Sequence, residues 1–107
     1  MRAIKDDNLN IYIDIDETLT FDEGKTFVEE GISFIKDKSN KCNIFIWSQG
    51  GYSYALDIVK KADISDYIVA VLPKPDIAID DLDFNSFSNT FRPNWQKINA
   101  ILSQLNL

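Results

Sequence analysis

Short runs of apolar residues alternate along this chain with longer amphipathic stretches. The apolar runs are rich in β-branched and aromatic residues, so we expect buried strands at Ile11–Ile15, Asn43–Trp47, Tyr67–Leu72 and Ile77–Ile79. The amphipathic stretches predict helices from Thr26 to about Lys38, from Ser53 to about Ala62 and from Pro93 to about Leu105. Residues 86–93 are expected to form a polar loop before the last helix.

Strands that alternate with helices predict a parallel sheet with helices on both of its faces. No repeat or linker divides the chain, so we expect one domain over residues 1–107. The expected fold class is α/β, a three-layer, doubly wound, Rossmann-like parallel sheet. In such a sheet, ligands bind beyond the carboxyl ends of the strands.

The expected strands end in polar residues that could share one site. In chain order these residues are Asp14 and Asp16, then Ser48, then Lys74, then Asp80 and Asp81. Because parallel strands place their carboxyl ends at the same edge of a sheet, we expect these side chains to meet there.

Composition narrows the chemistry that this edge could perform. The chain of 107 residues has a net charge of −6, no histidine and one cysteine, Cys42. The missing histidine excludes Ser-His-Asp triads and His-based zinc sites. The negative charge makes nucleic acid an improbable partner. No apolar run is long enough for a membrane span and the N-terminus lacks the apolar stretch of a signal peptide, so we expect no membrane partner. Because one cysteine cannot form an internal disulfide, we expect a cytoplasmic protein.

The carboxylates at the sheet edge predict a divalent metal. Three or four carboxylates that crowd together are unfavourable unless a cation neutralises them. Mg²⁺ suits a site made only of oxygen ligands, because it binds one or two carboxylates together with water and phosphate oxygens. We therefore expect Asp14, Asp16, Asp80 and Asp81 to supply the metal site, with only one member of the last pair required.

The same residues could carry out phosphoryl transfer. An aspartate can attack phosphorus to form an aspartyl-phosphate, and a second carboxylic acid can protonate the leaving oxygen. Ser48 could donate a hydrogen bond to a phosphoryl oxygen, and Lys74 could place a positive charge beside it. Phosphoryl transfer depends mostly on such positioning and charge stabilisation.

At these residues the chain resembles the haloacid dehalogenase-like superfamily. Residues 11–20, IYIDIDETLT, look like the first motif of that family, an apolar strand followed by Asp-x-Asp-x-Thr. Residues 44–48, IFIWS, are similar to its second motif, an apolar strand that ends in Ser or Thr. Residues 77–81, IAIDD, look like its fourth motif, which ends in an acidic pair.

The resemblance implies a role for each residue. Asp14 would be the nucleophile, and Asp16 the general acid and base, with its backbone carbonyl on the metal. Lys74 would be the lysine of the third motif, with Lys60 and Lys61 as the other candidates. The acidic pair Asp80-Asp81 would complete the Mg²⁺ site.

Little sequence separates these motifs, so the chain looks like a member of the family without a cap domain. The resemblance then implies a Mg²⁺-dependent phosphatase with an open site and a phosphorylated substrate, either a small molecule or a macromolecule. We expect a monomer or a weak dimer, because the net charge of −6 opposes self-association. Two alternatives stay open: a binding module of this fold that has lost turnover, and a receiver-type domain that accepts a phosphoryl group for signalling.

Overall fold

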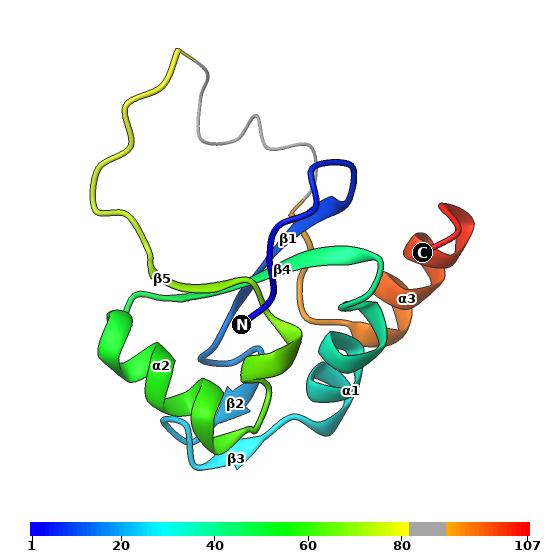
Figure 1. Ribbon diagram of the computed structural model, residues 1–107. Helices are drawn as coiled ribbons and strands as arrows, with labels where there is room; N and C mark the ends of the chain where they lie inside the picture. Colours follow the sequence, from blue (N-terminus) through cyan, green and yellow to red (C-terminus); the bar gives the residue numbers. More distant parts are fainter. Residues whose placement is uncertain (82–89) are drawn as a thin grey trace.

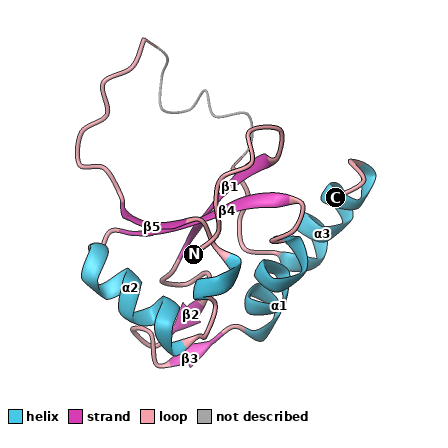
Figure 2. Cartoon of the chain, in the orientation of Figure 1, coloured by secondary structure: helices cyan, strands magenta, loops and turns pink. Residues whose placement is uncertain are grey.

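The computed structural model describes residues 1–81 and 90–107 (Figure 1). In chain order, the described elements are β1 (Leu9–Asp14), β2 (Thr20–Phe21), β3 (Thr26–Phe27), α1 (Glu29–Lys38), β4 (Cys42–Ser48), α2 (Tyr52–Lys61), the 3₁₀ turn η1 (Ser65–Tyr67), β5 (Ala70–Pro73) and α3 (Trp95–Gln104). They make a small α/β domain in which three strands and three α-helices form the main body (Figure 2). None of the described helices has the length and apolar character required to cross a membrane.

The main sheet is parallel, with the strand order β1-β4-β5. Its register places Ile13 beside Ile46, and Ile46 beside Val71. Each crossover steps in the same direction across the sheet, and such crossovers are almost always right-handed. Both crossover helices therefore lie on one face, and Figure 1 shows α1 and α2 below the sheet.

The core lies between that face and the helices. Ile13, Ile46 and Val71 are buried in a single cluster with apolar side chains from all three helices. From α3, Trp95 packs against Phe34 of α1 with ring centroids 5.1 Å apart. Burial of a large apolar side chain contributes about 1.5–3 kcal/mol, so this one cluster provides most of the driving force for folding.

The opposite face of the sheet has no helical layer in the described part of the chain. Tyr12 and Phe45 stack there with ring centroids 4.6 Å apart, and Trp47 meets Tyr12 edge-on at 5.1 Å. The N-terminal segment crosses this side, where the Lys5 N–H donates to Oδ1 of Asn43 at 2.9 Å. The expected α/β class with a parallel sheet is therefore confirmed, whereas the described residues form one helical layer in place of the two expected, because both crossovers proceed in the same direction.

The expected helix start at Thr26 is also corrected. Thr26 and Phe27 instead form β3, which pairs in antiparallel fashion with Phe21 and Thr20 of β2. Positive φ angles at Asp22 (52°), Glu23 (56°) and Gly24 (86°) allow the chain to reverse between the two strands. The first helix begins at Glu29, after this hairpin.

The expected fourth strand, Ile77–Ile79, is not formed. Ile77 is 82% exposed and Ile79 is 97% exposed, on the loop that rises away from the helices after β5 (Figure 1). Pro73 and Pro75 precede it, and each proline fixes its own φ and restricts the conformation of the residue before it. Residues 86–89, half of the expected 86–93 loop, lie outside the described residues, and residues 90–93 form neither helix nor strand, as expected.

The predicted C-terminal helix is confirmed, with a start two residues later than expected. Asn94 caps the helix, because its Oδ1 accepts a hydrogen bond from the Lys97 N–H at 3.1 Å. Pro93 therefore precedes the cap instead of occupying the first turn.

Candidate active site

Three of the predicted residues meet at the carboxyl ends of the three strands. Asp14 ends β1, Ser48 ends β4, and Lys74 directly follows β5. The Lys74 N–H donates to the Ser48 carbonyl at 3.0 Å, which extends the β4–β5 pairing by one step. The prediction that these strand ends converge is confirmed for Asp14, Ser48 and Lys74.

Asp14 and Lys74 form an ion pair across the end of β4. The Lys74 Nζ lies 3.0 Å from Asp14 Oδ1, and the side chains are 27% and 31% exposed, respectively. The same Nζ lies 5.7 Å from the centre of the Trp47 ring. The Thr18 hydroxyl donates a long, 3.4 Å hydrogen bond to Asp14 Oδ2. Both carboxylate oxygens therefore have a partner that orients them.

Ser48 is almost completely buried, with 1% of its surface exposed. Its Oγ accepts a hydrogen bond from the Gly50 N–H at 3.0 Å. A hydroxyl that accepts one bond still has a proton to donate, so Ser48 can serve a ligand oxygen at the strand ends. Gly50 is required for this tight turn, because a Cβ there would lie 2.8 Å from the Tyr54 ring and 3.3 Å from Ser48 Oγ.

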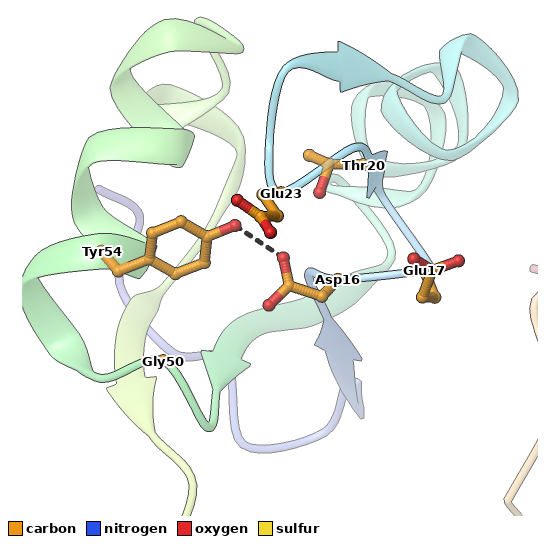
Figure 3. Close-up of a pocket in the computed structure, with 6 residues that line it drawn as sticks. All are labelled: Asp16, Glu17, Thr20, Glu23, Gly50 and Tyr54. Carbon is orange, nitrogen blue, oxygen red and sulfur yellow. Dashed lines mark hydrogen bonds between the residues drawn. The ribbon is translucent and has the colours of Figure 1, made fainter.

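Asp16 lies in a tight turn that follows β1. Glu17 has a positive φ of 62°, and the Glu17 N–H donates to the Thr20 carbonyl at 2.9 Å. The Asp16 carboxylate leaves this turn toward α2, where its Oδ1 accepts a 2.6 Å hydrogen bond from the Tyr54 hydroxyl (Figure 3). The turn thus directs Asp14 and Asp16 to two sides of the sheet edge, with Lys74 beside the first and Tyr54 beside the second.

Tyr54 is a site residue that the sequence pattern did not identify. Burial is the first cause that raises its pKa, to about 12, and the hydrogen bond and negative charge of Asp16 add to this effect, as does the charge of Glu23. The nearby Thr20 hydroxyl offsets part of the rise. The Tyr54 phenol therefore keeps its proton at neutral pH and remains a donor to Asp16.

A pocket of about 440 Å³ opens beside this hydrogen bond (Figure 3). We call it the acidic pocket, and its lining residues are Asp16, Glu17, Thr20, Glu23, Gly50 and Tyr54. Three carboxylates line it, and all three belong to exposed residues. The one feature of the sequence that could have indicated this pocket is the acidic turn 22–24, whose glycine allows the chain to reverse between β2 and β3.

The four carboxylates predicted for the metal site are not gathered into one cluster. Within residues 1–81 and 90–107, no group of three or more Asp, Glu or Cys side chains could hold a metal ion. Asp80 and Asp81 are exposed on the loop after β5. Mg²⁺ needs only one or two carboxylates beside water and phosphate oxygens. The oxygen donors of Asp14 and Asp16 fit this requirement, so a Mg²⁺ site stays a prediction for these two residues.

Comparisons with protein-family models, curated proteins and solved structures found no match to this chain. The chemistry of the site is therefore the basis for the functional assignment that follows.

Proposed function

We propose that this chain is a Mg²⁺-dependent phosphatase of the capless haloacid dehalogenase-like type, which hydrolyses phosphomonoesters through an aspartyl-phosphate on Asp14. The observation that carries this proposal is the 3.0 Å contact between Lys74 Nζ and Asp14 Oδ1. A lysine beside a strand-end aspartate provides both a nucleophile and a cation for the phosphoryl group that the nucleophile attacks.

In the first step, an Asp14 carboxylate oxygen attacks phosphorus while the bond to the leaving oxygen breaks. Lys74 holds Asp14 in place and balances the charge on the phosphoryl oxygens. The Ser48 hydroxyl, at the end of the central strand, donates a hydrogen bond to one of these oxygens. Asp16, in its protonated form, gives its proton to the leaving alcohol.

In the second step, water attacks the aspartyl-phosphate. Asp16, now a carboxylate, accepts a proton from that water, and inorganic phosphate leaves as the Asp14 carboxylate is restored. Tyr54 donates to Asp16 Oδ1 at 2.6 Å, so the other oxygen of that carboxylate is the one that carries the transferred proton. Asp14 and Asp16 would hold the Mg²⁺, which would screen the negative charges of nucleophile and substrate from each other.

The proposal is tested with 4-nitrophenyl phosphate and millimolar Mg²⁺. We expect turnover by the wild-type chain and its loss in Asp14→Asn, because a neutral amide is a poor nucleophile. Asp57→Asn is the matched control, since Asp57 is an exposed aspartate on α2 whose carboxylate pairs with Lys61, away from the strand ends. Equal rates in Asp14→Asn and the wild type would overturn the assignment.

The same preparation separates the alternatives. Stoichiometric labelling by acetyl phosphate without turnover would identify a phospho-accepting domain of the receiver type. Neither labelling nor turnover would identify a binding module without catalysis. We also propose that the chain is a monomer or weak dimer, which light scattering at several salt concentrations would test, with a salt-insensitive oligomer as the contrary result.

A further inference from the structure

The proposed site has opposite charges on its two sides. Lys74 lies beside Asp14 on one side. On the other side, the acidic pocket contains the carboxylates of Asp16, Glu17 and Glu23, and no lysine or arginine is among its lining residues in the described chain. Asp16 is the proposed proton donor to the leaving alcohol, so this pocket would receive the alcohol part of a phosphomonoester.

The acidic pocket also contains a buried hydroxyl that lies near the Tyr54 phenol but makes no hydrogen bond of good geometry within the described residues. Thr20 is 0% exposed, and its Oγ1 has no hydrogen-bond partner of good geometry within the described residues. The hydroxyl is directed into the pocket (Figure 3). A buried polar atom that makes no good hydrogen bond is unfavourable, so a ligand that donates to the Thr20 oxygen would gain affinity from this contact.

The ligand that fits these groups is a hydrogen-bond donor with positive charge. The Tyr54 hydroxyl already donates its hydrogen bond to Asp16 and is not available as a donor to a ligand. The pocket therefore presents mainly acceptors, which are the carboxylates and the Thr20 oxygen. An ammonium group carries three donors and no acceptor, and it would balance the charge that Glu23 places beside Tyr54.

We propose that the acidic pocket binds an aliphatic ammonium group on the alcohol part of the substrate, so that the preferred substrates are phosphomonoesters of amino alcohols. This inference rests on the proposed phosphatase function. An organic cation is favoured over a bare metal ion, because no group of three metal-ligating side chains is present in residues 1–81 and 90–107.

The test compares two probes of equal size, 2-aminoethyl phosphate and propyl phosphate, which differ in an ammonium in place of a methyl group. Their affinities are measured by titration calorimetry with the wild-type chain and Mg²⁺. We expect the ammonium probe to bind about two- to fivefold more tightly, the range for an ion pair in a solvent-accessible site. Equal affinities, or a preference for propyl phosphate, would overturn the inference.

Two variants assign the preference to the acidic pocket. Glu23→Gln removes one carboxylate and Thr20→Val removes the hydroxyl with little change of shape, and each should reduce the preference. Asp22→Asn removes the same charge from the neighbouring position of the turn, outside the pocket lining, and should keep it. A preference lowered equally by Asp22→Asn and Glu23→Gln would mean that the general negative charge, and not this pocket, attracts the probe.

Binding and turnover fail in distinguishable ways. Turnover of 4-nitrophenyl phosphate without any preference for the ammonium probe would leave the phosphatase standing and remove the ammonium site. A Glu23-dependent preference without turnover would support the ammonium site and remove the phosphatase. Displacement of the ammonium probe by Mg²⁺ from the acidic pocket, sensitive to Glu23→Gln, would show a metal site there and would overturn the inference.

Discussion

Lys74 Nζ lies 3.0 Å from Asp14 Oδ1, although Asp14 ends β1 and Lys74 follows β5, two strands that are not neighbours in the sheet. The central strand β4 lies between them, and the ion pair crosses it at Trp47, which is paired with Asp14 in the sheet and has its ring centre 5.7 Å from Lys74 Nζ. The ion pair therefore joins the two outer strands at the proposed phosphate position. Because both groups are about one-third exposed, the pair adds little to stability, and its main contribution would be to function.

Replacing this lysine should affect turnover far more than folding. Lys74→Met should lower kcat by about 10²–10³-fold, the usual effect of removing one stabilising donor from a transition state. The free energy of unfolding should change by less than about 1 kcal/mol. Lys60→Met is the matched control, because Lys60 is an exposed lysine on α2. If Lys60→Met abolished turnover while Lys74→Met did not, the phosphate-binding lysine would be Lys60.

The raised pKa of Tyr54 can be observed directly. Ultraviolet titration of tyrosinate, as the difference between wild type and Tyr54→Phe, should show this phenol ionising near pH 12. In Asp16→Asn the Tyr54 pKa should fall toward its ordinary value, because the negative charge that favours the phenol is removed. Ionisation of Tyr54 at the ordinary pKa of 10 in the wild type would contradict the contact with Asp16.

The same shift has a consequence for stability. The folded-state pKa of Tyr54 lies above the unfolded value, so the protonated phenol favours the folded chain. This contribution is complete below about pH 10 and is lost as the pH rises toward about 12. Chemical denaturation across this range should show a steeper loss of stability in the wild type than in Tyr54→Phe. Parallel curves for the two proteins would count against the linkage.

Two buried hydroxyls at the site should respond differently to removal. Ser48→Ala takes the acceptor away from the Gly50 N–H and should lower the free energy of unfolding by about 0.5–1.5 kcal/mol. Thr20→Val removes a hydroxyl that has no partner of good geometry in the described chain, and should be neutral or stabilising. Thermal melting of both variants checks the contrast, and a destabilised Thr20→Val would show that its hydroxyl is satisfied in solution.

The exposed loop after β5 should tolerate polar substitution. Ile77→Ser and Ile79→Ser should each change the free energy of unfolding by no more than about 0.5 kcal/mol. Ile46→Ala in the core should cost about 2–5 kcal/mol. Denaturant titration makes the comparison. Losses above about 1 kcal/mol for the loop variants would mean that Ile77 and Ile79 pack against the sheet in solution.

Magnesium should stabilise the folded chain through Asp14 and Asp16. At about 100 times its Kd, a ligand that binds only the folded state adds about 2.7 kcal/mol to the free energy of unfolding. The melting temperature should therefore rise with Mg²⁺ in the wild type and much less in Asp14→Asn. A melting temperature that ignores millimolar Mg²⁺ but rises with Ca²⁺ would point to a different kind of site.

The sequence predicted those features of the fold that depend on residues close together in the chain. The apolar runs that end at Asp14 and Ser48 became adjacent parallel strands, and the rule for strand ends placed Lys74 beside them. Ile77–Ile79 has the same apolar pattern but forms no strand, because a strand also needs a partner strand for its N–H and C=O groups, and this segment lies exposed on the loop after β5. Pattern alone therefore identified strand composition without identifying strand pairing.

The acidic pocket could not be predicted from pattern for a different reason. Tyr54 lies one helical turn before Ile58, so the sequence pattern indicates a residue that packs against the core. Its hydroxyl contacts the site only because the turn after β1 brings Asp16 Oδ1 to 2.6 Å from it. The β2–β3 hairpin, which brings Glu23 to the same place, replaced the expected first turn of a helix at Thr26. These contacts join segments that are distant in the chain, and no local propensity encodes them.

The two tryptophans lie in separate environments, which gives the protein two optical reporters. Trp95 is buried between α1 and α3, so its fluorescence would follow unfolding of the core. Trp47 lies on the other face of the sheet, 5.7 Å from the Lys74 ammonium, so its fluorescence would respond when an anion reaches that lysine. Trp47→Phe and Trp95→Phe would each isolate one emission, and occupancy of the site could then be recorded independently of the folded fraction.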